Sequence, residues 1–313
     1  MIQILSLTTP IFAVMLVGYL CGRRGLFPAG AGMLLTNYVF LLCMPVYLFV
    51  AIARMDPAAA IRGTYLMSYA LSFGLTALIG AAGAAFLFRR RSRELVLATM
   101  CSAHSNAGYL GIPLVILAFG EVTPAVAVIC FQVVVVTPIV LFLLELGARG
   151  EAVSPTAVRR IPAIALTNPV VAGSLAGFAV ALTGVPLPPL VVETGEFLGG
   201  AAMPTAIFAL GLSLAERPAP GVVDGTWGEL VWLTSVKLVV APLCAWGTGA
   251  WLGALSPRDL GALCVMAGMP AAMNAFIFAR RYNTFVGESS RAVLWSTVGC
   301  VVTVNLILWA VRP

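Results

Sequence analysis

The chain has 313 residues, of which 61% are hydrophobic and only 10% charged, and its mean hydropathy is +1.03. An ordinary soluble domain carries about 25% charged residues, so this composition excludes one and predicts a membrane protein. The formal net charge of +6 is compatible with nucleic-acid binding. However, the basic residues fall in short loops between apolar segments, where they set membrane orientation. We therefore expect the lipid bilayer as the surroundings and no nucleic-acid partner.

Ten apolar segments follow one another along the chain and predict an all-α membrane protein. The first is too long for the apolar part of a signal peptide and no basic stretch precedes it, which favours a membrane span. The expected helices are Ile4–Cys21, Gly32–Ala53, Thr64–Phe88, Leu95–Phe119, Pro124–Leu146, Ala163–Thr183, Leu190–Leu214, Glu229–Leu252, Leu260–Ala279 and Ala292–Val311.

The chain divides into two halves of five expected helices each, residues 1–147 and 162–313, joined by a loop over residues 148–161. Most arginines lie in loops on the same side as this connection. The bias of basic residues towards the cytoplasm therefore predicts a multi-pass protein of the plasma or inner membrane with both termini external.

The two halves repeat each other at an offset of 159 residues. Five is an odd number of crossings, so the second copy must enter the membrane from the opposite side. Inverted repeats with discontinuous helices are characteristic of secondary transporters. The matching pairs are Pro10 and Pro169, Gly18 and Gly177, Pro45 and Pro204, and Phe49 and Phe208. Pro45 and Pro204 are expected to kink their helices.

A helix break is predicted over His104–Pro113, inside the fourth expected span. Gly108 and Gly111 loosen the backbone and Pro113 lacks a donor, so a regular helix is disfavoured. Backbone groups freed at membrane depth must be satisfied by protein, water or a ligand, which makes this segment a candidate substrate site. The repeat predicts a second break in the ninth span, around Pro270.

With these motifs the chain resembles the auxin efflux carrier family. The motifs are Asn106–Pro113, Met269–Arg280 and the stretch from Lys237 to Pro242. Bacterial relatives in that family look like permeases for small organic anions such as malonate or malate, and plant members export auxin. The resemblance implies a fold shared with sodium/bile-acid symporters. It also implies a scaffold of helices 1, 2, 6 and 7, a transport domain of helices 3–5 and 8–10 with crossing broken helices, elevator-like movement and a homodimer.

Asn106 and Asn274 are the first candidates for substrate contact. Helix N-termini at the breaks would present N–H groups and positive dipole ends to a carboxylate, and the amide side chains would donate to the same oxygens. The alternative is that the two asparagines only cap the broken helix ends.

Three further polar residues are candidates for the site. Lys237 lies deep in the eighth span, where a charge is costly. It either attracts the anion, alternates between the substrate and backbone carbonyls, or snorkels to the interface. His104 either accepts a proton or forms structural hydrogen bonds. Gln132 either lines the site or joins helices.

These observations predict a secondary transporter of a small organic anion working by alternating access. The alternative is a sodium-coupled symporter of the bile-acid type, although scarce buried acids favour proton coupling or uniport. A membrane enzyme is disfavoured because no HExxH, GxSxG or paired intramembrane aspartates occur. A channel or receptor is disfavoured by the repeat. A single histidine and seven scattered cysteines predict no metal site and no cofactor.

Overall fold

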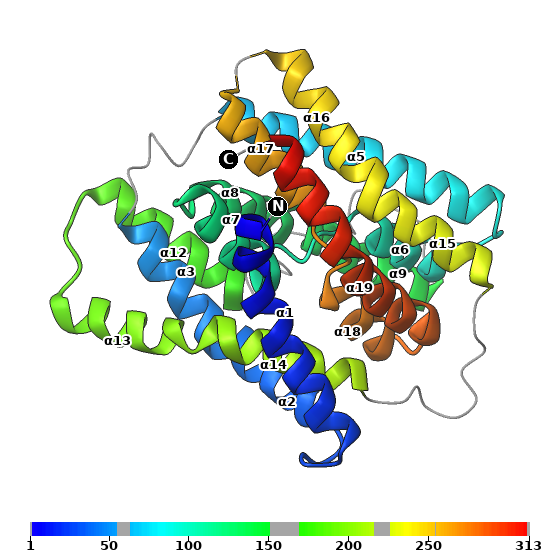
Figure 1. The fold of residues 1–313 in the computed structure, drawn as a ribbon, viewed down its shortest axis with the longest axis horizontal. Helices are drawn as coiled ribbons and strands as arrows, with labels where there is room; N and C mark the ends of the chain where they lie inside the picture. The colour runs from blue at the N-terminus through cyan, green and yellow to red at the C-terminus, as the bar shows by residue number, and fades with distance from the viewer. Residues whose placement is uncertain (1, 55–62, 151–168, 216–225, 254, 312–313) are drawn as a thin grey trace.

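The computed structural model describes residues 2–54, 63–150, 169–215, 226–253 and 255–311 (Figure 1). Regular structure within these residues is entirely helical, apart from one isolated β-bridge. Residues 151–161 of the predicted connecting loop and the start of the sixth expected helix lie outside the described residues, whereas Ala148 and Arg149 extend the preceding helix.

Within the described residues, six helical stretches are long and apolar enough to cross a membrane. They are α2 (Ala31–Tyr38), η1 (Val39–Cys43) and α3 (Met44–Ala53); α5 (Gly63–Phe86); α8 (Thr123–Phe131), η3 (Gln132–Val136) and α9 (Thr137–Arg149); α13 (Pro189–Gly200) and α14 (Ala202–Ala215); α15 (Trp227–Ser235), η4 (Val236–Val240) and α16 (Ala241–Leu252); and α19 (Val286–Val311).

The other expected segments fall on shorter or interrupted helices. These are α1 (Ile2–Arg23), α12 (Pro169–Thr183), α6 (Ser92–Ala103) with η2 (Ala107–Gly111) and α7 (Ile112–Phe119), and α17 (Pro257–Ala267) with α18 (Met273–Arg281).

Each of the four π-helical turns, η1 to η4, directly precedes an α-helix whose second residue is proline. Proline has no N–H to donate and its ring crowds the preceding turn, so the helix widens there. The prolines are Pro45, Pro113, Pro138 and Pro242. The kink expected at Pro45 therefore takes the form of η1, and the helix of Pro204 is interrupted at Ala201, between α13 and α14.

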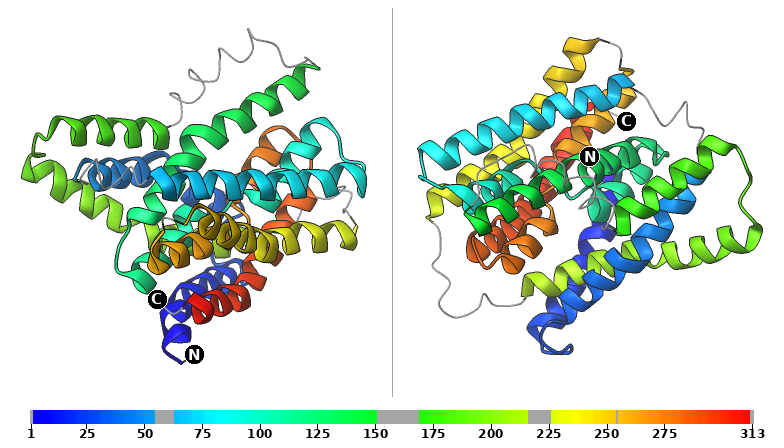
Figure 2. Two further views of the ribbon diagram at one scale, coloured as in Figure 1. Left: turned by 90° about the horizontal axis from the view of Figure 1, so that it is seen from above. Right: turned by 180° about the vertical axis from the view of Figure 1, so that it is seen from behind.

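The helices form two packed groups (Figures 1 and 2). In one, α1 packs along α14 beside α2, and α3 packs on α12 and α13. In the other, α5 packs on α6 and α16, while α19 packs on α15, α17 and α18. The segment η2–α7 contacts helices of both groups, so it lies at their junction.

Close helix packing in the first group depends on two glycines that match in the repeat. A methyl group at Gly18 of α1 would collide with the backbone of Phe208 in α14, and one at Gly177 of α12 would collide with the backbone of Phe49 in α3. Each glycine thus meets the phenylalanine of the other half.

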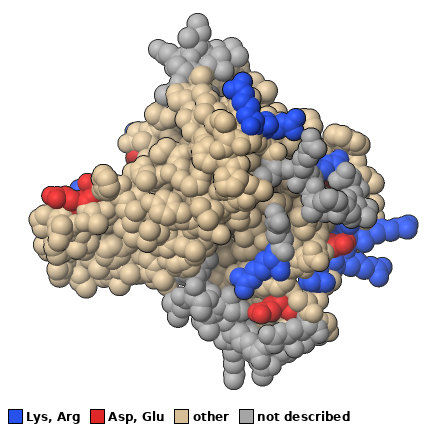
Figure 3. All heavy atoms as spheres, turned by 90° about the horizontal axis from the view of Figure 1, so that it is seen from below, with Lys and Arg blue, Asp and Glu red and all other residues tan. Residues whose placement is uncertain are grey.

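Large apolar side chains are exposed along the outer helices, as expected of a protein that faces lipid. Figure 3 shows a broad uncharged area on one face, with charged side chains gathered towards its edges. The most exposed include Leu34, Leu78, Phe86, Leu190 and Phe197.

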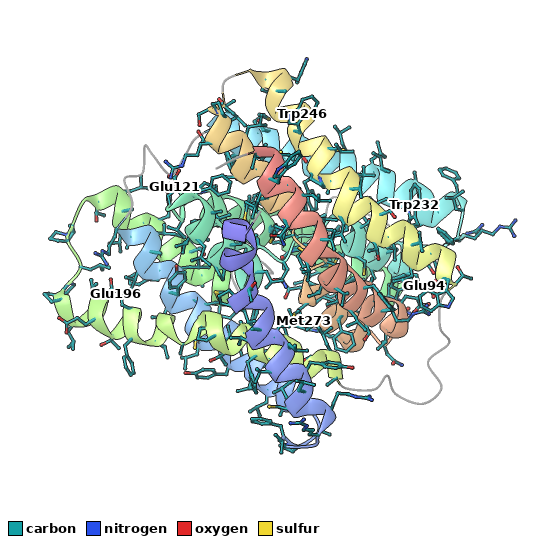
Figure 4. The ribbon with its side chains drawn as sticks, in the orientation of Figure 1. Glu94, Glu121, Glu196, Trp232, Trp246 and Met273 are labelled. Atoms are coloured by element: carbon teal, nitrogen blue, oxygen red, sulfur yellow. The ribbon has the colours of Figure 1, made fainter. Side chains whose placement is uncertain are left out.

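An ionic cluster fixes the start of α6 against two other helices. Arg90, in the loop before α6, donates to Glu229 of α15 at 2.7 Å and to Glu288 of α19 at 2.9 Å. It also pairs with Glu94, labelled in Figure 4, at 3.1 Å. The hydrogen bond to Glu229 raises the pKa of Arg90 above its ordinary value, against the effect of burial. Arg90 therefore stays charged and joins α6, α15 and α19.

Candidate functional site

The first helix break is present, but it is shorter than the sequence predicts. Helix α6 ends at Ala103, and His104 is extended, with φ −76° and ψ 113°. Helical backbone resumes at Ala107, so Gly108 and Gly111 lie in η2. Of the predicted segment, residues 104–111 lie outside regular α-helix, and only Ile112 and Pro113 are α-helical. Pro113 is the second residue of α7, where its missing N–H is tolerated because the first N–H groups of a helix have no intrahelical partner.

The second break lies between α17 and α18, where residues 268–272 are not helical. Pro270 lies within this interruption, as expected, and Asn274 is the second residue of α18. Asn274 therefore sits in the first turn of the second half-helix.

The two breaks cross each other and form hydrogen bonds between their backbones. Ser105 and Ala271 form an antiparallel bridge. The N–H of Asn106 donates to the carbonyl of Pro270 at 2.8 Å, and the N–H of Ala272 donates to the carbonyl of His104 at 2.9 Å. Backbone groups freed at both breaks thus satisfy one another, which makes an irregular backbone tolerable at membrane depth.

A cavity of about 60 Å³ lies at this crossing. The first residues of η2 and α18 line this cavity. One of them, Met273, is labelled in Figure 4 and lies near the centre of the molecule. Its lining residues are Phe40, Met44, Leu48, His104, Ser105, Asn106, Ala107, Gly108, Ile129, Gln132, Val133, Ala272, Met273 and Asn274. Four of the five predicted substrate-binding residues therefore meet at one cavity: His104, Asn106, Gln132 and Asn274.

The polar residues of the cavity differ in their surroundings. His104 is buried, and its Nδ1 has no hydrogen-bond partner in the part of the chain that the structure describes. Asn106 is also buried. Gln132 lines the cavity and also donates from Nε2 to the hydroxyl of Tyr69 at 2.8 Å, so it combines both roles considered for it. Its place in the π-helical turn η3 aims it across the bundle towards α5.

Lys237 lies beside the crossing without lining the cavity. Its side chain is fully buried in η4, which excludes the snorkelling alternative. The amino group donates to the carbonyl of Ala267 at 2.5 Å and to the hydroxyl of Ser105 at 3.0 Å. Ala267 is the last residue of α17, so the lysine satisfies a carbonyl at the negative end of that half-helix.

Comparison with known proteins identifies the family. A family model described as "Membrane transport protein" matches residues 4–308. The chain belongs to this family. Auxin efflux carriers belong to the same family, so the resemblance carried by the Asn106–Pro113 and Met269–Arg280 motifs is confirmed. The protein is a multi-pass membrane transporter, and the family is one of transporters and not of enzymes.

Two relatives of the transporter match over nearly their whole length. A protein of Rhizobium meliloti (strain 1021) named "Putative malonate transporter" is 27% identical over 318 residues, covering 100% of this chain and 97% of the relative. The "Uncharacterized transporter YfdV" of Escherichia coli (strain K12) is 25% identical over 315 residues, covering 97% of this chain and 96% of the relative.

Sequence reasoning missed three polar residues of the transporter that organise the crossing. The hydroxyl of Ser105 accepts a hydrogen bond from Lys237 and donates to the carbonyl of Ala267 at 3.3 Å. Ser296 of α19 accepts from the N–H of Ala271 at 3.0 Å. The hydroxyl of Tyr69 in α5 accepts a hydrogen bond from Gln132. A serine in the middle of an apolar span was the available signal for Ser296, and the segment that includes His104 already contained Ser105.

Proposed function

We propose that this transporter carries a small organic anion across the membrane by alternating access at the crossing cavity. The observation that carries the proposal is the convergence of two helix starts and two asparagines on one buried cavity. The residues that begin η2 and α18 line the cavity, so both helices direct the positive end of their dipoles at it. The N–H of Ala107 donates to the carbonyl of Ser105 and the N–H of Ala275 to that of Ala272. Asn106 and Asn274 add amide donors beside them.

The size of the cavity favours a compact anion. A cavity needs about 10–15 Å³ by this measure to hold one water molecule, so 60 Å³ corresponds to roughly four to six waters. Such a space suits a short dicarboxylate such as malonate better than the two fused rings of indole-acetate. The Rhizobium relative named as a malonate transporter supports the same choice.

The packing of matched glycines supports an inverted repeat of ten helices. Gly18 meets Phe208 while Gly177 meets Phe49, which is the exchange of contacts that a two-fold relation between the halves produces. On this proposal the group containing α1, α3, α12 and α14 is the scaffold of a homodimer, and the other group moves as an elevator. Both termini face outwards, as the basic loops predict.

The sodium-coupled alternative gains no support from the site. Sodium binding prefers carboxylate and carbonyl oxygens. None of the residues lining the cavity is acidic, and the described part of the chain contains no group of three or more His, Cys, Asp or Glu side chains arranged to hold a metal ion.

The proposal is tested by uptake of labelled malonate, malate and indole-acetate into liposomes containing the purified transporter. We expect saturable uptake of malonate or malate, and a loss of at least tenfold in kcat/KM for Asn106→Ala and for Asn274→Ala. Removing one donor to a charged group costs about 1.5–3 kcal/mol, which corresponds to this change. Asn37→Ala is the matched control, because Asn37 is exposed on α2. Wild-type rates in both cavity variants would contradict the site assignment.

A further inference from the structure

The cavity proposed to hold the anion offers no charged side chain to balance a negative charge. Its lining contains amide, hydroxyl, imidazole and apolar side chains, and none of its lining residues is Lys, Arg, Asp or Glu. Moving a carboxylate from water into such surroundings without a compensating charge is very costly. Amide donors and helix ends reduce that cost, but they carry no net charge that travels with the anion.

Histidine is the side chain type whose ordinary pKa lies nearest neutrality, and His104 is the only histidine among the residues that line the cavity. It is 2% exposed, and its Nδ1 has no hydrogen-bond partner among the described residues. It is also the residue that follows the last turn of α6, at the helix end where a positive charge is favourable. Nδ1 of His104 can therefore take up a proton or contact a ligand in the cavity.

The other titratable groups near His104 come from neighbouring helices. Lys237 of η4 reaches Ser105, the next residue, but directs its amino group at the carbonyl of Ala267. Tyr69 of α5 is engaged by Gln132. Like charges repel, so the lysine makes a protonated histidine unfavourable until an anion enters the cavity.

We propose that His104 is the proton-binding group of the cavity and that each anion crosses the membrane together with one proton. This inference rests on the proposed function. A proton from the aqueous side adds to a nitrogen of the imidazole as the anion binds, and both leave on the opposite side, so no bond of the substrate is changed. Because binding of proton and anion is mutually favourable, each raises the affinity for the other by the same factor.

The first test measures proton uptake when malonate binds to the purified wild-type transporter. At about pH 8, where free carboxylates are ionised, a pH-indicator dye in weakly buffered detergent solution reports the protons taken up. We expect about one proton per malonate bound. Saturable malonate binding without proton uptake would overturn the inference and leave the proposed function intact. This measurement needs no variant, so it does not depend on how well an altered chain folds.

The second test imposes a pH gradient on liposomes whose membrane potential is clamped to zero. One proton per anion allows malonate to accumulate up to about tenfold for each pH unit of gradient. We expect this accumulation for the wild type and its loss in His104→Asn, which places a polar atom near the position of Nδ1. Gradient-driven accumulation in His104→Asn would overturn the inference. Absence of malonate uptake in the wild type under every gradient would instead contradict the proposed function.

Discussion

Lys237 is a buried residue that contacts the crossing of the two helix breaks without lining the cavity. Its amino group holds the end of α17 and the hydroxyl of Ser105, and the side chain does not line the cavity. A buried charge in a membrane span needs such partners. We therefore propose that Lys237 supports the crossing and does not contact the anion directly.

The lysine is tested by Lys237→Met. The substitution removes the hydrogen bonds from the charged amino group to the carbonyl of Ala267 and the hydroxyl of Ser105, each worth about 1.5–3 kcal/mol, and leaves Ser105 as the donor to that carbonyl. We expect a lower transport rate and a lower Tm, but a smaller change in malonate affinity than Asn106→Ala produces. Affinity and rate are separated by binding to detergent-solubilised protein and uptake into liposomes. A loss of affinity greater than that of Asn106→Ala would show that Lys237 contacts the anion.

At the scale of helices, the crossing depends on how α6 is held at its start. Arg90 joins this start to Glu229 of α15 and Glu288 of α19, and Glu229 is 2% exposed. Removing one partner from a buried ion pair typically costs about 3–5 kcal/mol, and partial exposure of Arg90 places the expected cost at or below that range.

The cluster is tested by Arg90→Met, with Arg91→Met as the matched control because Arg91 is exposed. We expect a lower Tm in detergent for Arg90→Met and no change for Arg91→Met. Equal Tm values for the two variants would contradict the role of the cluster.

The helix breaks themselves were predictable from the sequence, but the contacts that hold them were not. Glycine, proline and asparagine inside apolar spans are visible as local exceptions, and the repeat related one break to the other. Ser296 and Tyr69 form hydrogen bonds with residues that belong to other helical segments, and hydropathy does not show which segments meet. The partner of Lys237 depends on where α17 ends, which hydropathy does not specify. The π-helical turns before prolines were likewise unforeseen, because a proline signals a disturbance and not its form.

At the scale of the whole molecule, the two halves meet through equivalent close contacts. Gly18 lies on Phe208 and Gly177 lies on Phe49, so α1 and α12 play matching parts in the first helix group. A side chain at either position must push two helix backbones apart, and overpacking of this kind costs about 1–3 kcal/mol.

This equivalence is tested by Gly18→Val and Gly177→Val, compared with Gly247→Val. A side chain at Gly247 meets nothing within 4 Å. We expect similar decreases in Tm for the first two variants and little change for the third. A decrease confined to one of the two matched glycines would argue against a two-fold relation between the halves.

The central claim is that the cavity at the crossing holds the anion, and filling the cavity tests it most directly. Gly108 lines the cavity, and a Cβ there would meet only the end of Met44, at 3.3 Å. The measurement is saturable binding of labelled malonate to purified Gly108→Leu, with Gly247→Leu as the control and Tm as the check on folding. We predict that Gly108→Leu loses malonate binding while Gly247→Leu retains it and both stay folded. Wild-type malonate affinity in folded Gly108→Leu would contradict the account.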